Sequence, residues 1–156
     1  MQLTLAHIGP KSPKQSAKSH YESLTRLYLD RIAPYHPVQS EAFPTEAAFL
    51  SWFQRQHTRT PALPVLLHRT GRQLASTEVA TWLGQRRDQG TQHIVFAIGP
   101  PDGWSNQTLE ITKPNAGLQL SFGPITLPHE LARLVLAEQL YRACTILAGH
   151  PYHSGH

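Results

Sequence analysis

Apolar positions along the chain form short runs of strand length that alternate with longer stretches of helical spacing. We expect five strands, at residues 2–8, 38–43, 63–67, 93–98 and 118–122. We expect helices at about 15–32, at about 45–57, from residue 76 to just beyond Gly84, weakly at 106–112, and from Pro128 to about residue 147. Strands that alternate with helices are typical of an α/β fold, in which a mainly parallel sheet carries helices on both faces. No linker or repeat divides residues 1–156, so we expect a single domain.

The last expected helix is apolar around most of its circumference, which indicates burial or packing against a partner. Glu138 and Arg142 lie four residues apart on it and are therefore neighbours on its surface. In such apolar surroundings the pair is expected to be buried. Structural and functional roles are equally open to it.

Ligands of open α/β sheets bind beyond the carboxyl ends of the strands, and three such ends stand out, at 66–68, 98–103 and 121–128. The segment 98–103 matches neither a Walker loop nor G-x-G-x-x-G. Pro100 and Pro101 lack N–H groups, which argues against a nucleotide-phosphate site. From their residues alone, 98–103 is better explained as a structural turn, and 121–128 as an ordinary connection from strand to helix.

Composition narrows the class of protein further. The formal charge of +4 and the pI of about 9.5 favour a polyanionic partner such as nucleic acid. The single cysteine, Cys144, excludes an internal disulfide and a cysteine-based zinc site, and its apolar surroundings predict a small buried side chain. No signal peptide or membrane-spanning run is evident, so we expect a cytoplasmic protein.

The tail contains His150, His153 and His156 at a spacing of three. Ligands to a metal need a rigid element to hold them, and Pro and Gly interrupt this segment. We therefore expect no metal site.

Two longer motifs carry a family resemblance. The run Leu127-Pro128-His129-Glu130-Leu131-Ala132-Arg133, continued by Glu138, Tyr141-Arg142-Ala143 and then Pro151-Tyr152-His153, closely resembles the carboxyl-terminal signature of the RlmH family. These are the 23S rRNA pseudouridine-N3 methyltransferases of the SPOUT superfamily. Residues 98–103 fall where that family has I-G-G-x-x-G, and Leu3, Leu5, Gly9 and Lys11 resemble its opening strand and loop. The resemblance spans the chain and is strongest in the last third.

The resemblance implies a SPOUT fold with a carboxyl-terminal trefoil knot, a homodimer, S-adenosylmethionine as cofactor and 23S rRNA or the ribosome as partner. It places the cofactor at Leu67, Gly99, Phe122, Gly123, Pro124, Ile125, Thr126 and Leu127. It places the catalytic, RNA-facing set at Glu138, Arg142, Tyr152 and His153. The tail of one subunit would reach the cofactor of the other.

Within that implied set, we expect Arg142 to stabilise an anion or a phosphate and Glu138 to orient Arg142. His153 is the candidate proton acceptor, and Tyr152 is placed to stack on the base or hydrogen-bond to it.

The sequence departs from the family pattern at His68, Pro100 and Pro124. Pro100, which stands where the family has its second glycine, leaves open an alternative: an RNA- or ribosome-binding relative that has lost the cofactor. A small-molecule or metal-binding α/β protein is the least favoured hypothesis.

Overall fold

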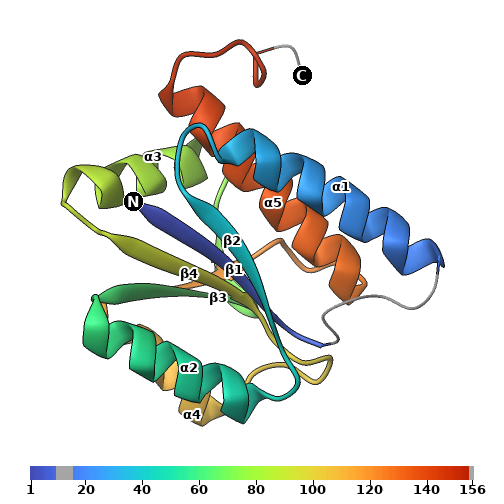
Figure 1. Cartoon of the computed structure of the whole chain (residues 1–156), viewed down its shortest axis with the longest axis vertical. Helices are drawn as coiled ribbons and strands as arrows, with labels where there is room; N and C mark the ends of the chain where they lie inside the picture. The colour runs from blue at the N-terminus through green and yellow to red at the C-terminus, as the bar shows by residue number, and fades with distance from the viewer. Residues whose placement is uncertain (10–15, 155–156) are drawn as a thin grey trace.

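The structure is a computed structural model that describes residues 1–9 and 16–154 (Figure 1). Its strands are β1 (Gln2–Ile8), β2 (Val38–Phe43), β3 (Ala62–Gln73), β4 (His93–Ile98) and β5 (Leu118–Ser121). Its helices are α1 (Ser16–Ile32), α2 (Glu46–Arg59), α3 (Ser76–Asp88), α4 (Asn106–Leu109) and α5 (His129–Leu147), with a 3₁₀ turn, η1 (Glu110–Thr112), directly after α4. Lys11 and His156, which the sequence analysis singled out, lie outside the described residues.

The five strands form one sheet in the order β2-β1-β4-β3-β5, and every neighbouring pair is parallel. All six residues of β4 are buried, as expected for a central strand that is covered on both faces. The predicted α/β class with a parallel sheet is confirmed.

Helices cover both faces of this sheet (Figure 1). On one face, Leu29 of α1, Leu83 of α3 and Leu140 of α5 belong to a single buried apolar cluster with residues of the sheet. On the other face, Phe49 and Phe53 of α2 belong to a smaller buried apolar cluster with residues of the strands. Most of α5 is therefore held between α1 and α3, which explains its apolar circumference.

Strand β3 is longer than the sequence analysis predicted, because it continues past residue 67 to Gln73. Leu67 and Arg72 both pair with Leu120 of β5, so residues 68–71 form a bulge. Gly71 permits the close approach of the two strands, since a Cβ there would lie 2.6 Å from the backbone of Gln119. Thr70 and Gly71 both lie in this bulge.

Helix α3 also extends further than a glycine near its end suggested. Gly84 is buried in its third turn, where an added Cβ would lie 2.9 Å from Leu147 Cδ2 of α5. Near its start, Ser76 Oγ donates a hydrogen bond to Gln139 Oε1 of α5 at 2.6 Å. Ser76 and Gly84 follow one another along α3 as their partners Gln139 and Leu147 do along α5. The two helices therefore lie side by side and run in the same direction.

Two details of α5 refine the sequence expectations. Pro128 caps α5, which begins one residue later, at His129. Cys144 is buried, and burial raises the pKa of its thiol to about 11, so it packs as a small apolar residue, as predicted.

No helix in the described part of the chain combines the length and apolar character needed to cross a lipid bilayer.

Candidate functional site

The carboxyl half of α5 carries an ion pair on its surface. Glu138 Oε1 accepts hydrogen bonds from Arg142 Nε at 3.0 Å and from Arg142 Nη2 at 2.6 Å. The two side chains are only 18% and 15% exposed. Two hydrogen bonds and limited solvent access fix the guanidinium far better than an exposed helical pair would be fixed.

The tail folds back onto this pair. Tyr152 donates its hydroxyl hydrogen to Glu138 Oε1 at 3.1 Å, and the Arg142 guanidinium lies 4.9 Å from the centre of the Tyr152 ring. His153 Nδ1 lies 3.1 Å from Arg142 Nη1. The structure thus brings together all four residues that the resemblance assigned to catalysis. We call these four residues the polar cluster.

Hydrogen bonding fixes the protonation of the cluster. The hydrogen bond to Glu138 raises the pKa of Arg142 further above its ordinary value, and burial, followed by hydrogen bonds with Tyr28 and Glu138, raises the pKa of Tyr152. Arg142 can only donate, so His153 Nδ1 must accept its hydrogen, and the neutral ring then carries its own proton on Nε2. At neutral pH the cluster therefore presents donors to a substrate.

A second layer of side chains supports the cluster. Gln139 donates to Glu138 Oε2 at 2.7 Å and accepts from Ser76 of α3. The ring of Tyr141 packs edge-on against Tyr152, with centroids 4.7 Å apart. Sequence reasoning gave none of these residues a role. Tyr141 stood in the family motif, whereas Ser76 is brought here only by helix packing.

The expected cofactor segment, residues 122–127, lies at the opposite end of α5. Gly123 has a φ of 101°, a conformation that favours glycine, and its N–H donates to Ser121 Oγ at 3.0 Å. Ser121 Oγ in turn donates to the carbonyl of Arg69 in the β3 bulge at 3.1 Å. These bonds tie the segment to the carboxyl edge of the sheet.

A cavity of about 160 Å³ beside this segment contains five of the eight expected cofactor residues in its wall: Leu67, Phe122, Gly123, Ile125 and Leu127. A neighbouring cavity of about 290 Å³ shares Phe122 and Gly123 and extends between α3 and α5 to Gln139. Pro124 and Thr126 are exposed and line neither cavity.

Gly99 lines neither of these cavities and packs against Trp104, a residue without a predicted role. A Cβ on Gly99 would lie 2.8 Å from the Trp104 indole. Trp104 Nε1 donates to the carbonyl of Leu67 at 3.1 Å, and the indole is buried. The glycine thus leaves room for the indole, and Trp104 joins the loop after β4 to the middle of β3. The adjoining loop is a tight turn, with the N–H of Gly103 donating to the carbonyl of Pro100 at 2.8 Å.

The two groups of expected site residues are far apart within one chain. Glu138 follows Pro128 by ten residues and Arg142 by fourteen, which along a helix corresponds to about 15 and 21 Å. Transfer between two bound groups requires reacting atoms about 3–3.5 Å apart. Within one chain, the two groups are connected by the cavity that extends from Gly123 to Gln139.

Among residues 1–9 and 16–154 no group of three or more potential ligands is arranged to hold a metal ion.

Comparison with known proteins identifies the family. The family model "Predicted SPOUT methyltransferase" matches residues 1–153. Ribosomal RNA large subunit methyltransferase H of Koribacter versatilis is 45% identical over 156 residues, which is all of both chains. The protein of the same name from Xanthobacter autotrophicus is 36% identical, over 98% of this chain and 99% of its own.

A similar fold occurs among solved structures. The SpoU methyltransferase AviRb from Streptomyces viridochromogenes, solved in complex with AdoMet, superposes with a TM-score of 0.51 at 12% identity, covering 94% of this chain and 58% of that one. At that identity the likeness concerns the fold alone. Together with the whole-length relatives, the family model shows that this chain belongs to the SPOUT methyltransferases, in the family of ribosomal RNA large subunit methyltransferase H.

Proposed function

We propose that this protein transfers a methyl group from S-adenosylmethionine to N3 of a pseudouridine in 23S rRNA of the large ribosomal subunit, in the cytoplasm. The observation that carries the proposal is the polar cluster, since a carboxylate, a guanidinium, a phenol and an imidazole converge in a chain that is 45% identical over its whole length to a methyltransferase of large-subunit rRNA. The net charge of +4 suits a polyanionic substrate.

The cavity beside residues 122–127 fits part of such a cofactor. Leu67, Ile125 and Leu127 supply apolar walls, and nothing lies within 4 Å of the position where a Cβ of Gly123 would stand, so a ligand can approach the backbone closely. Bound there, the sulfonium of the cofactor supplies an electrophilic methyl group. We assign Leu67 and 122–127 to holding it, with Gly99 acting through Trp104.

The polar cluster would act on the base. Deprotonating the imide leaves negative charge on N3 and its flanking carbonyl oxygens, and the fixed cation of Arg142 would stabilise that charge. Glu138 holds Arg142 in place, and Tyr152 offers its ring for stacking. His153 would first donate from Nε2, and it would take the N3 proton only after substrate displaces its Nδ1 from Arg142.

We further propose that the protein acts as a homodimer. The separation of about 15–21 Å along α5 would be bridged if the polar cluster of one subunit lay over residues 122–127 of its twin. Leu24 and Leu27, exposed on α1 beside α5, are apolar side chains that such an interface would cover. The trefoil knot stays a prediction from the family.

The direct test is a methylation assay on ribosomes from a bacterial strain that lacks this modification. We expect one labelled methyl group per large subunit, found on pseudouridine N3 by mass spectrometry of digested rRNA. Calorimetry with S-adenosylmethionine provides the second measurement. Ribosome binding without cofactor heat or methyl transfer would favour the alternative of a cofactor-free relative.

A further inference from the structure

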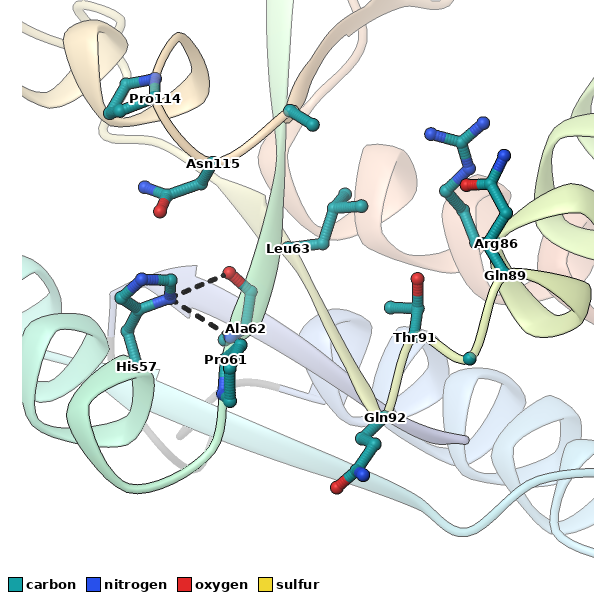
Figure 2. Close-up of a pocket in the computed structure, with 12 residues that line it drawn as sticks. His57, Pro61, Ala62, Leu63, Arg86, Gln89, Thr91, Gln92, Pro114 and Asn115 are labelled. Carbon is teal, nitrogen blue, oxygen red and sulfur yellow. Dashed lines mark hydrogen bonds between the residues drawn. The ribbon is translucent and has the colours of Figure 1, made fainter.

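A larger cavity, of about 550 Å³, lies at the amino-terminal ends of β3, β4 and β5 (Figure 2). Its walls come from the end of α2, the start of β3, the last turn of α3 with the loop that follows it, and the loop before β5. Its volume is in the range of small-ligand sites. None of the functions assigned above uses it.

The lining of this cavity combines apolar and polar groups, with the apolar surface slightly larger, and contains no carboxylate among the described residues. Gln89, Gln92 and Asn115 contribute amide side chains, each of which can donate and accept. Arg86 contributes the guanidinium of α3, whose Nε is buried without a hydrogen-bond partner in the described part of the chain. Such a lining suits a ligand that has both donors and acceptors and carries no positive charge.

His57 adds a directed donor. Its Nδ1 lies 3.1 Å from both the N and the O of Ala62, at the start of β3 (Figure 2). The backbone N–H of Ala62 can only donate, so Nδ1 accepts and the neutral ring carries its proton on Nε2. That N–H is not used within the described structure and remains available to a ligand.

The carboxyl terminus of α3 affects which part of a ligand the cavity can bind. A helix carboxyl terminus bears partial negative charge, which disfavours a phosphate deep in this cavity and favours a neutral polar group. Phosphates would be accommodated outside, where Arg59 at the end of α2 is an exposed cation and Lys113, before the β5 loop, is exposed and paired with Glu110. A nucleobase inside, with its backbone at the rim, matches this distribution of charge.

We propose that this cavity binds an unpaired base of the RNA substrate, in addition to the base that is methylated. The proposal rests on the function proposed above and adds a second contact to it. The arrangement of the helices supports this second contact. Helices α3 and α5 run in parallel, and Gly84 near the end of α3 lies against Leu147 at the end of α5. The cavity and the tail that carries Tyr152 are therefore both near the carboxyl ends of these two helices.

Binding can be tested directly by titrating ¹⁵N-labelled protein with adenosine 5′-monophosphate and uridine 5′-monophosphate. We expect amide resonances of residues 89–92 and 115 to shift with at least one of the two, while those of the polar cluster do not follow the same titration. Absence of shifts around the cavity at millimolar nucleotide with both probes would overturn the proposal, whether or not the protein methylates ribosomes.

Kinetics test the role in the reaction. We expect Arg86→Gln to raise the KM for ribosomes about tenfold with kcat and cofactor affinity unchanged. Arg87→Gln is the matched control, because Arg87 is the next residue, carries the same charge and pairs with Asp88 without lining the cavity. Gln92→Ala, at an exposed side chain, serves as a second variant if Arg86→Gln proves unstable. The proposal would be contradicted if the KM of Arg86→Gln, or that of the second variant Gln92→Ala, equalled the KM of the Arg87→Gln control.

Discussion

At the scale of single residues, the polar cluster depends on one carboxylate. Glu138 Oε1 accepts hydrogen bonds from both Arg142 and Tyr152, so the tail is held in position by the ion pair of the helix. The sequence motif named these residues, but the shared oxygen atom and the contact of His153 Nδ1 with Arg142 come from the tertiary structure.

Replacing Arg142 by Ala removes the only fixed cation of the cluster. We expect methyl transfer to ribosomes to fall at least about 100-fold, because no fixed cation would remain to stabilise charge on the imide, while cofactor binding stays as in the parent protein. Single-turnover assays and calorimetry provide the two measurements. Arg142→Lys keeps the charge but loses the two bonds to Glu138, and we expect intermediate activity from it. Full activity of Arg142→Ala would remove Arg142 from the mechanism.

Two buried histidines make stability depend on pH. Burial lowers the pKa of His93, and burial with the nearby amino terminus and Arg87 lowers the pKa of His36, both from 6.5. Below about pH 6.5 the unfolded chain therefore binds more protons than the folded one, and the free energy of unfolding falls as pH decreases. Urea unfolding at pH 7.5 and 5.5 would measure this. His93→Gln should weaken the dependence; an unchanged slope in that variant would show that His93 does not contribute.

At the scale of elements, the edge pair β3–β5 contains the least regular part of the sheet. The bulge at 68–71 lets Leu67 and Arg72 face the same partner residue, and it sets the position of Ser121 and Gly123 through the carbonyl of Arg69. The bulge therefore positions residues 122–127, the segment proposed to hold the cofactor.

Gly71→Ala tests that dependence. Its Cβ would lie 2.6 Å from backbone atoms of Gln119, which cannot move aside as a side chain could. We expect a loss of about 1–3 kcal/mol in the free energy of unfolding and weaker cofactor binding. Urea denaturation and calorimetry measure the two effects. Thr70→Ala, at the exposed neighbouring residue, is the control, and equal stability of the two variants would mean that β5 accommodates the added carbon.

At the scale of the whole molecule, each chain has its polar cluster and its cofactor segment at different ends of α5. In the homodimer proposed above, a twin subunit would supply the other half of each site. In that dimer, catalysis would depend on assembly.

Subunit mixing tests this directly. Arg142→Ala impairs the polar cluster, and Gly123→Val impairs the cofactor segment, because a β-branched residue is strained at a φ of 101°. If sites are shared, mixed dimers carry one intact site, and an equimolar mixture should regain about a quarter of the parent activity after subunit exchange. Transfer assays before and after exchange measure the gain. No regain, with mixed dimers detected by native mass spectrometry, would place both halves of the site on one subunit.

The local pattern of residues in the sequence determined the fold class, the family and the residues of the polar cluster. Alternating strand and helix periodicities predicted the parallel α/β sheet, and the motif from Leu127 to His153 predicted the membership of the family and the four residues of the polar cluster. These properties depend on short-range spacing, which the chain displays directly. Only the tertiary structure decided the bulge in β3, the bond from Trp104 to Leu67 and the support of Gln139 by Ser76. Each of these joins residues far apart in sequence, and such contacts are decided by how whole elements pack against one another.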